Sequence, residues 1–397
     1  MDAVIIEAGA AVIGDTVRRD VAVHVANGVI RGIAGAGNYR DPSARVIDAH
    51  HLTLIPGLID VHIHGGFGRS FQGDSEDIGQ LARDLPRWGV TTVLPTLGAV
   101  PRAELASAVG RLVRYMRTAE RGCRFAGIHL EGPYFNPKRK GAQHAEAIRL
   151  PDVAEVRALL DAARGQIRLM TIAPEMPGAA DVLRVLDAAG VMASVGHSEA
   201  TLDTLVAATR LGLRHATHTF NAMLGLQHRS PGTVGAVLSL DEIECELIAD
   251  GVHVDPTVLR VAWKAKGTDG IVLVSDATAV AGMPDGSYDQ GHRVVLVSNG
   301  RATLADGTLA GSCTPLIRGV KTMVEDCGVP LATAVQMATA NPARSAGCSQ
   351  RTGTIAVGKD ADLVLIDEAF EPRLTMVRGA VEFEAVPNIV TKGDART

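Results

Sequence analysis

The stretch PGLIDVHIHG, residues 56–65, decides how this chain folds. Its apolar residues predict a short buried strand. Alternate residues of a strand point to one face, so His62 and His64 are expected to face the same way. Two neutral imidazoles placed side by side are ready ligands for a divalent metal. The competing interpretation is a pair of buried histidines that hydrogen-bond to the backbone.

Beyond this stretch, short apolar strands alternate with helices rich in Ala, Leu and Arg. Eight such units predict a closed parallel (β/α)8 barrel of about 250 residues, with His62 and His64 facing inward at the carboxyl ends of its strands. The alternative is a doubly wound open sheet. It is the weaker alternative because the polar residues described below lie at the ends of strands distributed over all eight units. The expected strands are Leu58–His64, Thr91–Thr96, Phe125–Glu131, Arg168–Pro174, Met192–His197, His215–Phe220, Cys245–Gly251 and Ile271–Asp276. The expected helices include Glu104–Arg117, Asp152–Ala163, Ala179–Ala189, Leu202–Leu211, Leu316–Glu325 and Leu331–Ala340.

The two ends of the chain predict a second, smaller β domain. Short apolar segments separated by turn residues occur at both ends, and Asn27-Gly28 is a strong hairpin signal. We expect a small β-sandwich built from residues 1–56 and 346–397, beside a barrel of residues 57–345. Its strand candidates are Val4–Glu7, Val21–Val25, Val29–Ala34, Arg45–Asp48, Gly353–Ile355 and Asp362–Ile366.

Composition excludes several classes of protein. Of the 397 residues, 46% are hydrophobic and 21% charged, which favours a large core over disorder. The formal net charge of −5 gives no sign of nucleic acid or an anionic membrane as a partner. Five cysteines without a CxxC pair indicate a reducing compartment. Because the sequence also shows neither a signal peptide nor a run of 18 apolar residues, we expect a cytoplasmic protein.

Three further strands end in a residue that can bind a metal. Glu131 ends the third strand, His197 the fifth and His218 the sixth. A single histidine at a strand end would be weak evidence. Barrel enzymes assemble their sites from the carboxyl ends of several strands, however, so these residues are expected to join His62 and His64.

Two more histidines and one carboxylate lie on the same strands. His129 is expected one layer deeper than Glu131, as a core histidine held by a hydrogen bond. His215 lies three residues before His218 and is expected to face the opposite side of its strand, in a structural role. Asp276, at the end of the eighth strand, can take a proton from an activated water and return it to a leaving amine. Its alternative role is to cap the next helix.

Several sequence blocks taken together resemble the N-acetylglucosamine-6-phosphate deacetylase family of amidohydrolases. The resemblance runs from about residue 1 to 385 and implies deacetylation of an amino-sugar phosphate by a homodimer. The alternative within the same chemistry is the galactosamine isomer, which differs in the configuration of one hydroxyl. The blocks are HLEGP (129–133), GHS (196–198), NAM (221–223), DGVHVD (250–255), SDAT (275–278), AG (281–282), LAGS (309–312) and NPAR (341–344).

The resemblance also implies a role for each matching residue. Glu131, His197 and His218 would hold the principal metal, zinc or iron, with manganese or cobalt as further candidates. Some members of the family lack the first histidine pair and use one metal; here His62 and His64 are present, so one or two ions per subunit are expected. Asp276 would be the general acid and base. The residues implied to bind substrate are Asn221, Ala222 and Arg229 for the phosphate and His253 for the sugar phosphate. We also expect apolar lid residues around Leu309 to exclude water.

One loop departs from the family pattern. Members often have a histidine after Lys-Gly in the loop that follows Glu131, where it is thought to polarise the acetyl carbonyl. This chain has Gln143 at the expected spacing and His144 one residue later. Either residue is a candidate for that role.

Two rival functions are open to the same fold. Cyclic amidohydrolases of the dihydroorotase or hydantoinase kind usually carry a metal-bridging lysine at the end of the fourth strand. Here that strand reads RLMTIAPE, residues 168–175, without a lysine. The other rival is a metal-free barrel that serves as a binding protein, and the metal content of the purified protein would discriminate it.

Overall fold

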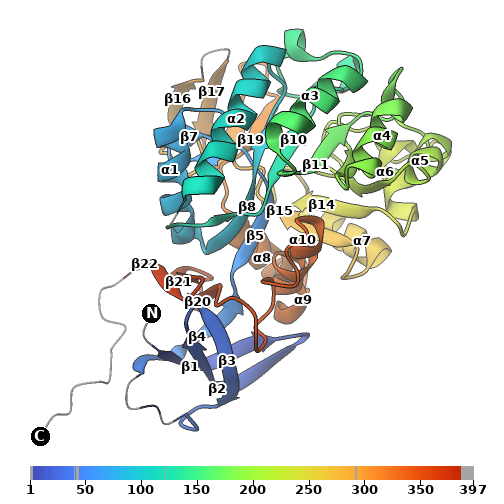
Figure 1. Ribbon diagram of the computed structural model, residues 1–397. Helices are drawn as coiled ribbons and strands as arrows, with labels where there is room; N and C mark the ends of the chain where they lie inside the picture. Colours follow the sequence, from blue (N-terminus) through green and yellow to red (C-terminus); the bar gives the residue numbers. More distant parts are fainter. Residues whose placement is uncertain (1–2, 40, 42–43, 120, 291–292, 386–397) are drawn as a thin grey trace, which may run out of the picture.

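A parallel (β/α)8 barrel forms the larger part of the computed structural model, which describes residues 3–39, 41, 44–119, 121–290 and 293–385 (Figure 1). Its strands follow one another in chain order around the barrel, each parallel to the next. A bridge between Ile63 and Ala277 brings the end of the last strand beside the first, so the predicted barrel is confirmed. The strands are β5 (Leu58–Ile63), β8 (Val90–Leu97), β10 (Ile128–Glu131), β11 (Ile167–Ile172), β12 (Met192–Val195), β13 (Leu213–Ala216), β14 (Glu244–Ile248) and β15 (Ile271–Val274).

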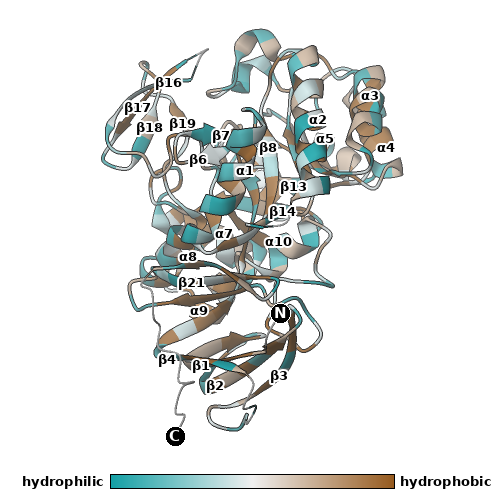
Figure 2. Ribbon diagram, turned by 60° about the vertical axis from the view of Figure 1, so that its left-hand side comes forward, coloured by the Kyte–Doolittle hydropathy of each residue, from teal (hydrophilic) through white to brown (hydrophobic). Residues whose placement is uncertain are grey.

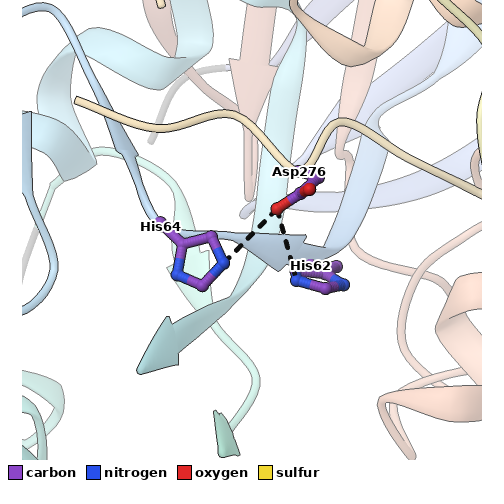
Figure 3. Close-up of side chains that lie close together, drawn as sticks. All are labelled: His62, His64 and Asp276. Carbon is purple, nitrogen blue, oxygen red and sulfur yellow. Dashed lines mark ion pairs between the residues drawn. The ribbon is translucent and has the colours of Figure 1, made fainter. Parts of the chain in front are cut away.

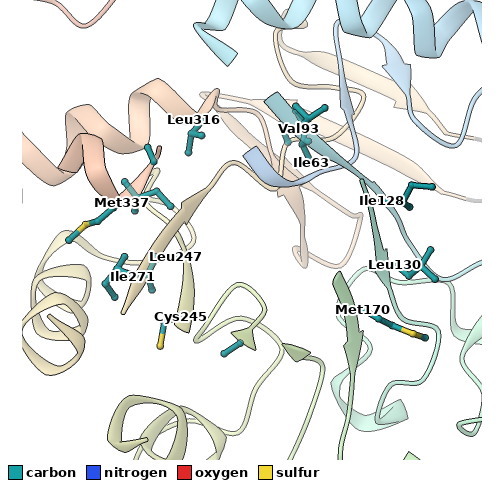
Figure 4. Packing of buried hydrophobic residues seen from close by; sticks show 14 of the residues in the cluster. Ile63, Val93, Ile128, Leu130, Met170, Cys245, Leu247, Ile271, Leu316 and Met337 are labelled. Carbon is teal, nitrogen blue, oxygen red and sulfur yellow. The ribbon is translucent and has the colours of Figure 1, made fainter. Parts of the chain in front are cut away.

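Helices cover the outside of the barrel and bury its main hydrophobic cluster. All eight residues of β8 are buried, and Figure 4 shows strand residues such as Ile63 and Val93 with Leu316 and Met337 from the helices. Apolar colour follows the strands in Figure 2, whereas the helices show patches of hydrophilic colour. Within the described residues, no helix is both long and apolar enough to cross a membrane. The helices are α1 (Ser75–Asp84), α2 (Arg102–Thr118), α3 (Val153–Ala163), α4 (Ala179–Ala188), α5 (Leu202–Thr209), α6 (Gly232–Ser239), α7 (Pro256–Lys266), α8 (Leu316–Glu325), α9 (Leu331–Met337) and α10 (Ala340–Ser345).

Both ends of the chain contribute to a separate, seven-stranded mixed sheet at the bottom of Figure 1. Its order is β22-β21-β20-β4-β1-β2-β3, so β20 from the far end of the chain pairs antiparallel with β4. The sheet has its own hydrophobic cluster, which includes Ile6, Val23 and Leu365. The strands are β1 (Val4–Ile13), β2 (Thr16–Ala26), β3 (Val29–Gly35), β4 (Arg45–Pro56), β20 (Leu363–Ile366), β21 (Pro372–Val377) and β22 (Ala380–Glu384).

A four-stranded antiparallel sheet is inserted between β15 and α8, and the sequence reasoning missed it. Its strands are short, and their outward residues include exposed Val294 and Leu296, so the segment lacks a clear alternation of apolar and polar residues. Its small core packs against Ala142 of the loop that follows β10. The strands are β16 (Gly286–Asp289), β17 (Val294–Ser298), β18 (Arg301–Thr303) and β19 (Leu309–Ser312), and three two-residue strands lie elsewhere, β6 (Gly65–Gly66), β7 (Arg69–Ser70) and β9 (Arg124–Phe125).

Several expected elements differ from the structure, three of them in ways that matter here. Residues 353–355 form no strand, because Gly353 adopts a left-handed φ of 86° that extended backbone does not allow. The expected helix Leu331–Ala340 ends earlier, at Met337 (α9), and a second helix, α10, begins at Ala340; Pro342 lies in the first turn of α10, where its missing N–H costs nothing. The sixth strand ends at Ala216 rather than Phe220, so His218 belongs to the turn after β13.

Candidate active site

A pocket of about 620 Å³ opens at the carboxyl ends of the barrel strands. Its walls are the loops that follow those strands, together with the β16–β19 sheet. The sequence-predicted residues that line it are His64, Glu131, Gln143, His144, His197, His218, Asn221, Ala222, His253, Asp276 and Leu309. His62 lies beneath the pocket surface, fully buried, and Arg229 is exposed and is not among the lining residues.

Glu131, His197 and His218 converge in one buried cluster. The Nε2 atoms of His197 and His218 lie 3.2 Å apart, and both face Oε1 of Glu131 at 3.0 and 3.1 Å. One carboxylate oxygen and two imidazole nitrogens, all within 4.8 Å of one another, form a donor set of the kind that holds Zn²⁺ or a similar divalent ion. The three residues that the sequence placed on three different strands are thus together.

His62, His64 and Asp276 form a second cluster beside the first (Figure 3). Oδ1 of Asp276 lies 3.4 Å from Nε2 of His62 and 3.3 Å from Nε2 of His64. The other oxygen of Glu131, Oε2, lies 3.2 Å from Nε2 of His64. Glu131 therefore faces both clusters, one oxygen to each, and is placed to bridge them.

The electrostatics of the two clusters also suit a cation. Burial alone would raise the pKa of the Glu131 carboxyl, but hydrogen bonds from His197 and His218 outweigh it and hold the pKa well below its ordinary value. The pKa of Asp276 is lowered in the same way, because the charge of His62 and a hydrogen bond from His64 outweigh burial. Nε2 of His62 is buried and has no hydrogen-bond partner. Ionised carboxylates and an unpartnered imidazole nitrogen are the atoms that a divalent ion would satisfy.

Backbone geometry turns these side chains into the barrel. His197, His218 and Asp276 each follow the last residues of a strand, and each has a left-handed φ, at 48°, 30° and 47°. Non-glycine residues in this region cost about 1–3 kcal/mol each and are concentrated at functional sites. His197 is held further by its Nδ1, which lies 2.7 Å from the carbonyl oxygen of Arg139. Because a carbonyl only accepts, Nδ1 carries the hydrogen, and the lone pair of Nε2 is left for the cluster.

His129 and His215 lie deeper in the barrel, in a layer of hydrogen bonds. Nε2 of His129 lies 2.8 Å from the hydroxyl of Thr171, as expected for a core histidine, and burial lowers its pKa to about 3. His215 is structural, but the reason given for it was wrong. Its ring contacts Ser194 and Glu246 inside the barrel. The expectation that it faces away assumed that His215 and His218 lie three residues apart on one strand, but the strand ends at Ala216.

The residues expected to bind substrate are spread over two walls of the pocket. Asn221 and Ala222 follow β13, and Ala222 has a left-handed φ of 51°. His253 follows β14, and its Nδ1 lies 2.7 Å from Oδ2 of Asp250. Burial alone would lower the pKa of His253, but the hydrogen bond and charge of Asp250 raise it above the ordinary value. Asp250 therefore favours the charged form of this imidazole, which suits an anionic group in the pocket.

Gln143 lies against Glu131, at the carboxylate oxygen that faces the second cluster. Its Nε2 donates to Oε2 of Glu131 at 2.6 Å, and its Oε1 accepts the backbone N–H of Ala99 at 3.0 Å. His144 also lines the pocket. Gln143, one of the two candidates for polarising a carbonyl, thus contacts a predicted metal ligand directly.

The family of this chain follows from comparison with known proteins. The model of the Amidohydrolase family matches residues 53–389. The chain belongs to the amidohydrolase family. It is 35% identical to N-acetylglucosamine-6-phosphate deacetylase of Bacillus subtilis over 382 residues, covering 92% of this chain and 96% of the relative. It is 36% identical to N-acetylgalactosamine-6-phosphate deacetylase of Escherichia coli O157:H7 over 327 residues, covering 82% and 86%.

A solved structure is similar to this amidohydrolase along nearly the whole chain. It is an aspartate-to-alanine variant of N-acetyl-D-glucosamine-6-phosphate deacetylase from Mycobacterium smegmatis, in complex with N-acetyl-D-glucosamine-6-phosphate. The TM-score is 0.89 at 33% identity, and the match covers 96% of this chain and 100% of the other. The resemblance found in the sequence is thereby confirmed, and the amidohydrolase is a metal-dependent hydrolase.

The fourth strand of this amidohydrolase gives no support to a lysine-bridged site. β11 reads IRLMTI, and the hydroxyl of Thr171 on this strand bonds to His129 and to the Thr217 hydroxyl. The strand therefore supplies hydrogen bonds to the layer beneath the clusters rather than a metal ligand.

Two residues of this amidohydrolase were missed by the sequence reasoning. Arg293 is the one lysine or arginine that lines the pocket in the described part of the chain, and it donates to the carbonyl oxygen of Ala142 at 2.7 Å. No motif or periodic pattern near Arg293 in the sequence indicates that it faces the pocket. Glu246 is fully buried beneath both clusters. Here a signal existed, because Glu246 lies between Cys245 and Leu247 in an expected barrel strand, and a glutamate in such a strand indicates a buried partner.

Proposed function

We propose that this amidohydrolase hydrolyses the acetamide of N-acetyl-D-glucosamine 6-phosphate to D-glucosamine 6-phosphate and acetate. The observation that carries the proposal is the convergence of six ligand-type residues at one pocket. Relatives named for this reaction, at about the same identity along most of the chain, support the choice of substrate. The six residues are His62, His64, Glu131, His197, His218 and Asp276.

The two clusters provide ligands for one or two divalent ions. Glu131, His197 and His218 would hold the first, and His62 and His64 would hold the second with Glu131 between them. A divalent ion at such a site supplies Lewis acidity, which polarises an amide carbonyl and makes a water molecule more acidic. Zinc or iron is our first choice and manganese or cobalt the next, since imidazole and carboxylate ligands suit all four.

Asp276 carries the proton in this mechanism. Its carboxylate lines the pocket and is held in place by His62 and His64. It accepts a proton from the attacking water and then delivers it to the nitrogen of the departing amine, which completes hydrolysis. Gln143, whose amide group lies against Glu131, is placed to donate to the acetyl oxygen as negative charge develops on it.

The phosphate end of the substrate would lie against the loops after β13 and β14. Asn221, Ala222 and His253 line the pocket on that wall, where the backbone N–H of Asn221 is itself bonded to the carbonyl oxygen of His218. Arg229, the guanidinium expected there, is exposed outside the pocket of a single chain, so its role stays a prediction. Leu309, at the start of β19, remains our candidate for excluding water from the reacting centre.

We also propose that the enzyme is a cytoplasmic homodimer.

The test is release of acetate from three substrates by metal-reconstituted protein. The substrates are N-acetylglucosamine 6-phosphate, N-acetylgalactosamine 6-phosphate and unphosphorylated N-acetylglucosamine. A strong preference for the first supports the proposal. A preference for the second supports the proposed deacetylation but assigns the galactosamine isomer as the substrate, as the similarity to the galactosamine enzyme would allow. No turnover of any of them, with metal bound, contradicts the proposed substrate class.

A further inference from the structure

A fully buried carboxylate lies directly behind the two ligand clusters. Glu246 is the third residue of β14, and its side chain has no exposed surface. An ionised carboxylate inside a protein costs several kcal/mol unless it is paired and hydrogen-bonded. The contacts of Glu246 therefore have to offset that cost, and they show what the residue does.

Glu246 contacts one residue of each cluster. Its Oε2 lies 2.8 Å from Nδ1 of His62 and accepts the backbone N–H of His218 at 3.0 Å. Its Oε1 lies 3.6 Å from Nδ1 of His215. One oxygen atom thus ties a ligand of the second cluster to the backbone of a ligand of the first.

The contact with His62 decides which ring nitrogen is free. An ionised carboxylate only accepts, so Nδ1 of His62 carries a hydrogen, and in a neutral ring the lone pair then belongs to Nε2. That Nε2 is buried, has no hydrogen-bond partner, and lies 3.4 Å from Oδ1 of Asp276 and 3.9 Å from Oε2 of Glu131. The free nitrogen therefore points at the two carboxylates that complete the second cluster.

His62, His129 and Glu246 also lie close enough together to be considered as a third metal site. Both ring nitrogens of His129 are already engaged, one by Thr171 and the other by Thr96 and a backbone carbonyl. Since His62 uses Nδ1 for Glu246, the trio is a hydrogen-bonded support and not a separate cation site.

We propose that Glu246 is a positioning residue that makes His62 a metal ligand, and that a second divalent ion binds tightly only when this carboxylate is present. The inference rests on the proposed metal clusters and not on the identity of the substrate. Residues that hold a ligating histidine through its other ring nitrogen typically contribute 10–100-fold to metal affinity. The same range is expected here for the second ion, while the first ion should be retained.

The experiment titrates Zn²⁺ into metal-free protein and counts the ions bound per chain by calorimetry and elemental analysis. Glu246→Gln keeps an acceptor for His62 but removes the charge, and Glu246→Leu removes both. We expect two ions in the unaltered protein, a second ion about 10-fold weaker in the glutamine variant, and about 100-fold weaker or absent in the leucine variant. Retention of the first ion shows that each variant is folded.

Glu155→Gln is the matched control. Glu155 is a buried carboxylate that bonds to Arg149 and Tyr134, away from both clusters, so its variant should bind two ions normally. Nitrogen NMR of the His62 ring in metal-free protein gives an independent readout: hydrogen should be held on Nδ1 in the unaltered protein and in the glutamine variant, and this preference for Nδ1 should be lost in the leucine variant.

Two ions bound with unaltered affinity in both Glu246 variants would overturn the inference, as would a single ion in the unaltered protein. Neither result depends on turnover. Unaltered protein that binds two ions but releases no acetate would instead refute the proposed function and leave the role of Glu246 standing.

Discussion

Replacing Asp276 by asparagine tests the assignment of the proton carrier most directly. The change keeps the shape of the side chain and exchanges one oxygen for an amide nitrogen. Asp276 is 9% exposed and lies 3.3–3.4 Å from two imidazoles, so the asparagine can occupy the same place. A positioned group that transfers a proton contributes about 10²–10⁴-fold to rate. At about 1.36 kcal/mol per factor of ten, the barrier should rise by about 2.7–5.4 kcal/mol.

The assay measures kcat for acetate release at saturating Zn²⁺, with metal content and substrate affinity determined on the same sample. We expect the Asp276→Asn variant to bind substrate about as well as the unaltered enzyme while kcat falls by about 10²–10⁴-fold. Metal content separates a lost proton carrier from a lost ion. Asp306→Asn, at an exposed loop of the inserted sheet, is the control and should keep full activity. A kcat within tenfold of the unaltered enzyme, with metal unchanged, would remove Asp276 from this role.

Three further predictions concern other parts of the pocket. Arg293→Ala removes a charged donor to the loop that carries Gln143, so kcat/KM should fall by about 10–100-fold. Arg293→Lys should recover part of the lost kcat/KM. Equal activity of the unaltered enzyme and both variants would contradict this role of Arg293. Gly65→Ala should lower the free energy of unfolding in urea by about 1–3 kcal/mol, because a Cβ there would lie 2.1 Å from a backbone oxygen of β7. Asp250→Asn removes the group that raises the pKa of His253. The charged ring exists below its pKa, so the loss of affinity for phosphorylated substrate with rising pH should begin at lower pH in this variant, and an unshifted profile of KM would refute the assignment.

The sequence predicted the barrel and most of the site because both depend on local patterns. His62 and His64 are two residues apart on one strand, and Glu131 ends another, so strand periodicity placed them correctly. His197, His218 and Asp276 were expected at the ends of strands, whereas each lies in a left-handed turn just after its strand. The misassigned orientation of His215 has the same origin.

What the sequence did not predict depends on contacts between distant segments. Arg229 lies near Asn221 in the chain and is exposed outside the pocket of a single chain, so its expected role at the phosphate stays a prediction. Arg293, about 150 residues from the loop it contacts, lies in the pocket. No local pattern predicts which of two loop arginines faces a cavity, because the packing of the inserted sheet against that loop decides it.

The pairing of β4 with β20 has a consequence for how the protein is made. β4 ends at Pro56 and its partner β20 ends at Ile366, so about 310 residues must be synthesised between them. At 5–20 residues per second, the edge of β4 stays open for about 15–60 s during translation. An unpaired strand edge readily pairs with other chains. We therefore expect the newly made N-terminal segment to be prone to aggregation during expression, and slower synthesis should increase the demand for chaperones.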